Sequence, residues 1–140
     1  MEIVEVKGFT ESQLEDMKVL MEQLTPGTVL TGEALSEVVA DPASHLFAMM
    51  DSGRIVATGT LCLYRAPYAR HATVEDVVVL SEYRGRGLGR MMMEHLLAEA
   101  ARHSPVEVSL TSKPSRAAAN ALYKSLGFCR KETNSYRMDL

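Results

Sequence analysis

A run of apolar residues that leads directly into a glycine-rich turn constrains the fold of this chain more than any other feature. Residues 77–80 read Val-Val-Val-Leu, a continuous apolar segment that is typical of a strand buried on both faces in the middle of a sheet. The turn follows at residues 84–89, Arg-Gly-Arg-Gly-Leu-Gly. Apolar residues then recur with helical spacing at Met92, Met93, Leu96, Leu97 and Ala100. The sequence therefore predicts a strand, a glycine turn and a helix in direct succession.

The rest of the chain alternates between strand and helix patterns. Strands are expected over residues 1–7, 45–50, 54–65, 73–80 and 106–111, and two last short ones over 128–131 and 135–140. Thr10, Thr31 and Ser115 are suited to cap three further helices at their N-termini. Gly53 suits a tight turn between the second and third strands, so these two should pair as an antiparallel hairpin. No linker or repeat interrupts the pattern, and we expect one α/β domain over residues 1–140.

Composition narrows the classes of partner. Acidic residues outnumber basic ones by 18 to 15 and the formal net charge is -3, which argues against binding to nucleic acid. No apolar run approaches the roughly 20 residues that cross a bilayer. Cys62 and Cys129 stand far apart with no secretory leader before them, and the histidines show no metal-ligand spacing. We therefore expect a cytoplasmic protein that binds neither a membrane nor a metal.

The start of the predicted helix after the turn suits an anionic ligand. The first N–H groups of a helix lack intrahelical partners and the helix dipole is positive there, so a pyrophosphate can approach the backbone beside the glycines. Arg84, Arg86 and Arg90 add positive charge. A Walker loop would need Gly-Lys-Ser/Thr at its end, and a dinucleotide fingerprint would need a glycine where Arg90 stands. ATP hydrolysis and dinucleotide binding are therefore disfavoured.

Arg84, Gly87 and Gly89 match a different signature. Their spacing resembles the Gln/Arg-x-x-Gly-x-Gly/Ala motif of the GNAT superfamily of N-acetyltransferases, which also lies between a strand and a helix. Residues 121–128, Ala-Leu-Tyr-Lys-Ser-Leu-Gly-Phe, are similar to the end of that family's fourth helix. The specific motif residues all lie within 75–128, and the N-terminal third matches only as an order of elements. The resemblance implies an α/β, GNAT-type fold with a mixed, largely antiparallel sheet of six or seven strands, flanked by helices and splayed beside the glycine turn.

The resemblance also implies acetyl-CoA as the cosubstrate. In the family the backbone of the signature holds the pyrophosphate, and the preceding strand aligns with the pantetheine amides as an added strand would. Asn120 stands on the last predicted helix, where its amide can hydrogen-bond the cofactor or simply pack. The predicted cofactor contacts are Val77, Val78, Val79, Arg84, Gly85, Arg86, Gly87, Leu88, Gly89, Arg90 and Asn120.

Transfer of an acetyl group to an amine needs a base for the amine and an acid for the departing thiolate. Glu75 and Asp76 are adjacent acids at the start of the apolar segment, and neighbouring strand side chains point to opposite faces, so at most one should face a cleft. We predict Glu75 as the base with Asp76 as its substitute and His71 as a minor rival. The alternative is that the two acids form a solvated strand end or pair with Arg70 or Arg84. The resemblance implies that Tyr123 protonates the thiolate, and the alternative is that Tyr123 is a core residue.

The sequence thus predicts an acetyl-CoA-dependent N-acetyltransferase that moves the acetyl group directly to a primary amine of a small molecule or a protein. The alternative is a non-catalytic sensor or partner domain that binds acetyl-CoA. Residues 74–79 are also similar to the corresponding strand of glucosamine-6-phosphate N-acetyltransferases, whereas residues 111–116 are not. Tyr68 and Arg70 are candidates for contacts with the acceptor. The identity of the acceptor stays open, and so does the oligomeric state, a homodimer included.

Overall fold

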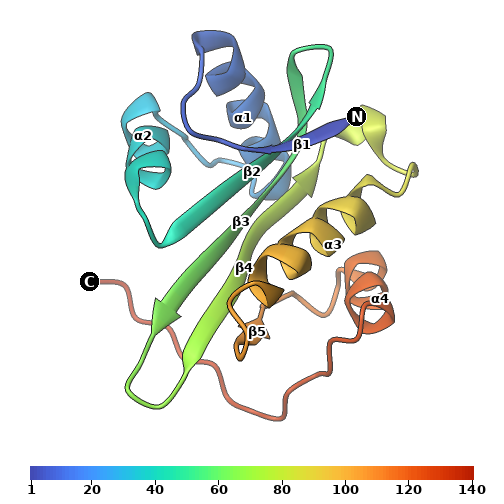
Figure 1. Ribbon diagram of the computed structural model, residues 1–140. Coiled ribbons are helices and arrows are strands. Elements are labelled where there is room, and N and C mark those ends of the chain that lie inside the picture. Colours follow the sequence, from blue (N-terminus) through green and yellow to red (C-terminus); the bar gives the residue numbers. More distant parts are fainter. The chain divides into compact units, whose positions relative to one another are not determined.

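The computed structural model describes all 140 residues, which form two compact units, Met1–Leu110 and Thr111–Leu140. The first unit holds a five-stranded sheet in the order β1-β2-β3-β4-β5 (Figure 1). Its strands are β1 (Glu2–Glu5), β2 (Ser44–Asp51), β3 (Arg54–Arg65), β4 (Arg70–Val79) and β5 (Glu107–Ser109). Neighbouring strands are antiparallel except β4 and β5, which run parallel. The predicted α/β class with a mixed, largely antiparallel sheet is confirmed, whereas the prediction of a single domain stays a prediction.

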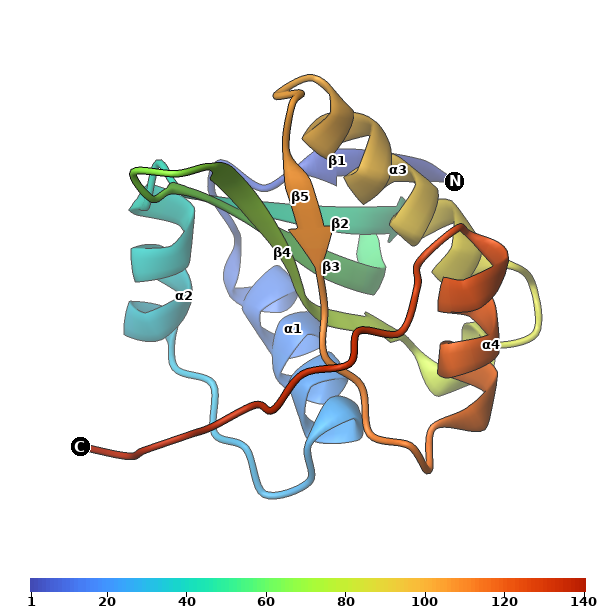
Figure 2. The same ribbon diagram turned by 90° about the horizontal axis from the view of Figure 1, so that it is seen from below.

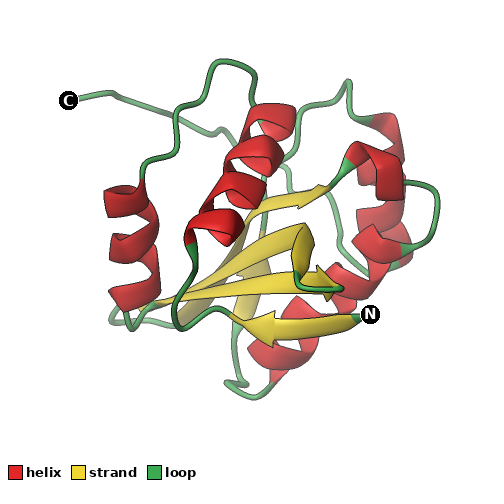
Figure 3. Cartoon of the chain, turned by 90° about the horizontal axis from the view of Figure 1, so that it is seen from above, coloured by secondary structure: helices red, strands yellow, loops and turns green.

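Helices surround this sheet. The first unit contains α1 (Glu11–Leu24), α2 (Gly32–Ala40), the short 3-10 helix η1 (Ser81–Tyr83) and α3 (Leu88–Ala101). Figure 2 shows α1 and α3 on opposite faces of the sheet, and Figure 3 shows the yellow strands of the sheet between red helices. The second unit contains α4 (Ala117–Ser125). The predicted succession of strand, glycine turn and helix is therefore present as β4, the turn and α3.

The predicted caps and hairpin explain why the first elements form where they do. Thr10 accepts a hydrogen bond from the Gln13 N–H and the Gln13 side chain accepts one from the Thr10 N–H, so α1 begins with a complete capping box. Thr31 caps α2 by a single bond, its side chain accepting from the Ala34 N–H. Ser52 and Gly53 both have positive φ, 51° and 83°, which is typical of the two-residue turn that joins antiparallel strands. These three predictions are confirmed.

Helix α3 packs directly on the backbone of β3 at Gly59. A Cβ built there would lie 3.0 Å from Leu96 Cδ1 and 3.2 Å from Met92 Cγ, so a side chain at this position would push α3 away from the sheet. Met92, Met93 and Leu96 are fully buried, whereas Met91 is 42% exposed. The methionine run is therefore core at two of its three positions.

A β-bulge interrupts β4 beside the predicted base. Thr58 pairs with Val78 and Thr60 pairs with Glu75, so the single residue between them on β3 faces two residues on β4. One of these, Asp76, has a φ of 51°, in the left-handed region that aspartate tolerates better than most residues. The regular strand that the sequence predicted is therefore interrupted at Asp76, and the expectation that only one of Glu75 and Asp76 faces a cleft stays a prediction.

Two predicted strands and one predicted cap do not form. Residues 128–131 and 135–140 have no strand structure, and the second unit contains no strand. A strand persists only when its backbone pairs with a neighbour, and these residues are almost all exposed. The sheet has five strands instead of six or seven. Helix α4 has Arg116 and not Ser115 at its N-cap, because the Arg116 N–H bonds to the Lys113 carbonyl and the helix begins one residue later.

Candidate functional site

One edge of β4 is open along its second half. Strand β5 pairs with β4 only from His71 to Thr73. The Leu80 N–H donates to the Val56 carbonyl at 2.8 Å, on the β3 side. Because backbone groups alternate between the two edges of a strand, those of Val77 and Val79 point to the other edge, where β5 has already ended. Of the three valines predicted to align with a cofactor, these two turn backbone groups toward the open edge.

The glycine turn begins directly after this open edge. Gly85 and Gly87 have φ angles of 78° and 76°, which L side chains rarely adopt, and a Cβ at either position would meet nothing within 4 Å. Gly87 is the N-cap of α3, and its carbonyl accepts from the Met91 N–H at 3.1 Å. The first amides of α3, from Leu88 on, therefore point out of the helix start without intrahelical partners. The predicted cradle for an anion is present in this geometry.

Helix α1 holds the chain where β4 passes into the turn. The Gln23 side chain donates to the Val79 carbonyl through Nε2 and accepts from the Ser81 N–H through Oε1, each at 3.3 Å. One amide side chain thus bridges the last residue of β4 and the first residue of η1. This bridge fixes the direction in which the chain enters the glycine turn. Because the Val79 carbonyl is already bonded to Gln23, the Val79 N–H is the backbone group of that residue left on the open edge.

A tyrosine positions one of the arginines of the turn. The Arg86 guanidinium lies over the Tyr83 ring, 4.7 Å from its centroid, and the Tyr83 hydroxyl donates to Asp51 Oδ2 at 2.6 Å. This hydrogen bond raises the pKa of Tyr83 above its ordinary value. Arg90 forms an i,i+4 ion pair with Glu94 at 3.5 Å. The sequence analysis did not identify Tyr83 or Asp51. The position of Tyr83, three residues before Arg86, could have indicated its role, whereas nothing in the sequence pointed to Asp51 in the distant hairpin.

The predicted base lies on β4, close to the bulge. Glu75 and Asp76 are both exposed, and Glu75 stands directly opposite Thr60 of β3. Arg70, considered as an ion-pair partner for these acids, donates instead to the His103 carbonyl at 3.1 Å. Tyr68, the other candidate for acceptor contacts, is 99% exposed at the tip of the β3–β4 hairpin. The Glu75 and Asp76 carboxylates are thus exposed to solvent, and they directly precede the residues whose backbone faces the open edge.

Two predicted site residues belong to the second unit. Tyr123 of α4 is half-buried and its ring meets the Phe128 ring edge-on, with centroids 6.1 Å apart. Asn120 Nδ2 donates to the Lys113 carbonyl at 3.0 Å and so holds the loop that precedes α4. Both side chains therefore have structural contacts inside their own unit, and their roles toward a cofactor stay predictions.

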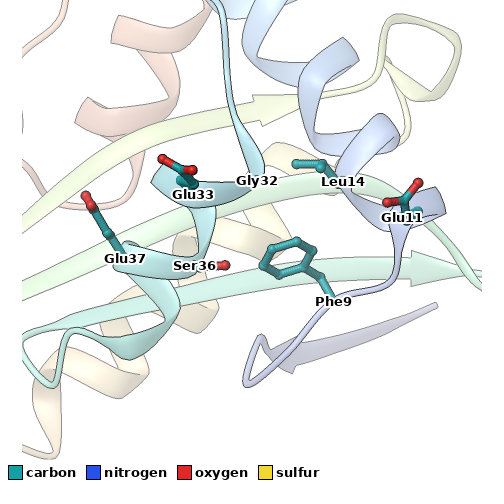
Figure 4. Close-up of a pocket in the computed structure, with 7 residues that line it drawn as sticks. All are labelled: Phe9, Glu11, Leu14, Gly32, Glu33, Ser36 and Glu37. Atoms are coloured by element: carbon teal, nitrogen blue, oxygen red, sulfur yellow. The ribbon is translucent and has the colours of Figure 1, made fainter.

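A pocket elsewhere in the first unit contains none of the predicted site residues. It has a volume of about 650 Å³ and is lined by Phe9, Glu11, Leu14, Gly32, Glu33, Ser36 and Glu37, from the starts of α1 and α2 (Figure 4). No group of three or more His, Cys, Asp or Glu side chains is arranged to hold a metal ion. None of the helices combines the length and the apolar character that crossing a membrane requires.

Several known N-acetyltransferases are similar in sequence to this chain. A ribosomal protein bS18-alanine N-acetyltransferase of Salmonella typhimurium is 46% identical over 57 residues, which are 41% of this chain and only 38% of that protein. The match thus spans little more than a third of the length of such relatives. Glucosamine 6-phosphate N-acetyltransferase 1 of Oryza sativa subsp. japonica is 32% identical over 122 residues, which are 80% of this chain and 72% of that protein.

Structural similarity extends over nearly the whole chain. The crystal structure of an acetyltransferase from Trypanosoma brucei superposes with a TM-score of 0.76 and 28% sequence identity, covering 99% of both chains. The profile of the acetyltransferase (GNAT) family matches residues 10–128. This range includes the open edge of β4, the glycine turn and α4. From the family match and these relatives, the chain belongs to the acetyltransferase (GNAT) family.

Proposed function

We propose that this chain binds acetyl-CoA along the open edge of β4 and at the glycine turn, and transfers the acetyl group to a primary amine. The observation that carries the proposal is the continuity of these two features: β5 ends at Ser109 opposite Thr73, and the unpaired edge of β4 then runs straight into the turn. The family match and the relatives named as N-acetyltransferases support acetyl transfer to an amine. They give no support to a non-catalytic sensor.

The two features suit the two chemical parts of acetyl-CoA. The amide-bearing pantetheine chain can hydrogen-bond the backbone of Val77 and Val79 in the manner of an added strand. The pyrophosphate can accept from the first amides of α3, and the arginines of the turn compensate its charge. Among these arginines, Arg86 is held against the Tyr83 ring.

The reaction then needs one proton removed and one supplied. The neutral amine attacks the thioester carbonyl, a C–N bond forms, the C–S bond breaks, and the nitrogen loses its proton as the sulfur gains one. Glu75 is the proposed acceptor of the amine proton, with Asp76 as substitute, and Tyr123 is the proposed donor to the thiolate. Family resemblance alone supports Tyr123, because it lies in the second unit.

Release of the coenzyme A thiol from acetyl-CoA in the presence of a panel of amines tests the proposal directly. The panel should include polyamines, aminosugars with and without phosphate, amino acids and peptides, because the acceptor class is open. Tyr123→Phe keeps the ring packed against Phe128 and should lower turnover about 10²-fold while the affinity for acetyl-CoA is retained. A protein whose melting temperature does not respond to saturating coenzyme A would contradict the binding site itself.

A further inference from the structure

On the side of the sheet opposite α3, where α1 also packs, β3 and β4 present a group of polar side chains. Thr60 stands opposite Glu75 across β3 and β4, Cys62 opposite Thr73, and Tyr64 opposite His71. Residues directly opposite one another share a face, as do alternate residues along a strand. We call these six residues the polar face: Thr60, Cys62, Tyr64, His71, Thr73 and Glu75. None of the six is fully buried, although they lie in the middle of the sheet.

The other face of the same two strands is different in kind. Gly59 on that face lies against α3, and Leu61 and Val74, which share the face by alternation, are buried. The paired arginines at the end of the hairpin, Arg65 and Arg70, fall on that face by the same alternation. The bond from Arg70 to the His103 carbonyl, just beyond α3, agrees with this. The polar face therefore contains a carboxylate, two aromatic rings and small polar groups, but no lysine or arginine.

An aromatic surface stands at one end of the polar face. The rings of Tyr64 and His71 are stacked, with centroids 5.1 Å apart and an angle of 19° between their planes. Tyr64 remains 52% exposed, so the stack fixes a ring that solvent or a ligand can still reach. A ring held in this way attracts an organic cation over its face. Glu107 of β5 stands beside His71 in the same row.

The two ends of the polar face are separated by a defined distance. His71 and Glu75 are four residues apart on β4, and a strand rises about 3.3 Å per residue, so the ends lie about 13 Å apart. One end offers the proposed base and the other offers an exposed, stacked aromatic ring. Thr73 lies between them, opposite Cys62, and contributes no charge.

We infer that the amine acceptor is an extended cationic molecule, a linear di- or polyamine, that lies along the polar face. Its reacting amino group is placed at Glu75, and a second ammonium group lies over the Tyr64 ring. The six side chains of the polar face include no lysine or arginine to pair with a phosphate, which disfavours an acceptor that carries one. This inference rests on the proposed acetyl transfer and specifies its acceptor.

A series of straight α,ω-diamines of increasing length, with straight monoamines as controls, tests the inference. We expect kcat/KM to rise with the length of the diamine and to peak where the two nitrogens are about 13 Å apart. Monoamines of equal length should not show this peak. A flat length profile, or a preference for glucosamine 6-phosphate or a peptide over every diamine, would overturn the inference.

Variants of Tyr64 separate this inference from the proposed function. Tyr64→Leu should raise KM for the optimal diamine about 2- to 5-fold, leave kcat and short monoamines unaffected, and be rescued by Tyr64→Phe, which keeps the ring. Tyr68→Leu is the comparison variant, because Tyr68, the acceptor contact that the sequence suggested, is 99% exposed in the same hairpin and is not one of the residues of the polar face. Equal effects of Tyr64→Leu and Tyr68→Leu would remove the aromatic end from the site. If the protein neither binds acetyl-CoA nor acetylates any amine, the proposed function itself fails; if only the diamine pattern is missing, the acceptor class is wrong.

Discussion

The glycine turn and the polar face carry side chains of opposite charge. The turn gathers Arg84, Arg86 and Arg90 around the N-terminus of α3 and depends on backbone amides and positive φ angles. The polar face has a carboxylate and stacked rings, and depends on which side chains the register of β3 and β4 brings together. This difference is what the two proposals require, an anionic cofactor at the turn and a cationic acceptor on the polar face.

Strand β4 contributes to both sites by different means. Near its end, Val77 and Val79 offer backbone groups at an open edge, whereas His71 and Glu75 offer side chains on a face. The bulge at Asp76 lies between the two parts. Because a bulge changes which face the following side chains occupy, it lets Val77 pack toward α3 while Glu75 keeps its place on the polar face.

The largest effect that separates the two sites is expected for Glu75→Gln. The affinity for acetyl-CoA should be unchanged, because Glu75 lies on the polar face and not at the turn. Transfer should fall about 10²-fold at lower pH, where the amine starts protonated, and the loss should shrink as the pH rises and more amine is neutral. Calorimetric titration with acetyl-CoA and pH profiles of kcat/KM measure the two quantities.

Asp76→Asn is the matched control for this prediction. Asparagine tolerates the left-handed φ of 51° that Asp76 adopts, so the substitution removes the charge without straining the bulge. A pH-dependent loss in Asp76→Asn and not in Glu75→Gln would move the base by one residue. The reacting amine would then not lie at Glu75 on the polar face.

The reverse separation is expected for Gly87→Val. Gly87 has a φ of 76°, which a β-branched residue adopts only with strain, so the turn should rearrange and its amides should no longer converge on a phosphate. We expect the affinity for coenzyme A to fall about 10- to 100-fold while circular dichroism shows a folded protein. Gly87→Asn should lose much less, because asparagine tolerates this conformation. Wild-type affinity in folded Gly87→Val would place the phosphates elsewhere.

The same contrast explains what the sequence could predict. The turn was visible because Arg84, Gly87 and Gly89 are close in the chain and local conformation determines their role. The polar face was not, because the pairing of Tyr64 with His71 depends on the register of a hairpin and on the bulge near Asp76. The sequence did not predict the Tyr83–Asp51 hydrogen bond for the same reason, because it joins residues 32 positions apart.

The sequence overestimated the sheet at its C-terminal end. Tyr136, Met138 and Leu140 alternate with polar residues as in a strand, but all three are exposed and no strand forms there. Alternation shows which side chains a strand would bury, and it does not supply the neighbour whose backbone must pair. The caps of α1 and α2 were predictable because each requires only residues within one turn.

A smaller effect at the turn is expected for Tyr83→Leu. The substitution removes the ring under Arg86 and frees its guanidinium to sample other positions. We expect coenzyme A to bind about 2- to 5-fold more weakly, with the loss shrinking at high salt, where the arginines contribute less. Titrations at two salt concentrations measure this. The kcat measured with both acetyl-CoA and amine at saturation should be unchanged, because the polar face is intact. A large fall in kcat would mean that the two sites are not separable.

The smallest effect, and the one that assigns the role of Tyr83 to its ring, is expected for Tyr83→Phe. Phenylalanine keeps the surface under Arg86 and loses only the hydroxyl that donates to Asp51 at 2.6 Å, so coenzyme A affinity should stay close to that of the wild type.

The hydrogen bond to Asp51 holds the pKa of Tyr83 above its ordinary value of 10.0. A raised folded-state pKa means that this bond stabilises the protein fully below pH 10 and stops doing so as the pH rises through the folded-state pKa. The melting temperature of Tyr83→Phe should therefore lie slightly below that of the wild type at neutral pH, and the difference should vanish in strong alkali. A loss of affinity as large as in Tyr83→Leu would show instead that the hydroxyl, through Asp51, positions the turn.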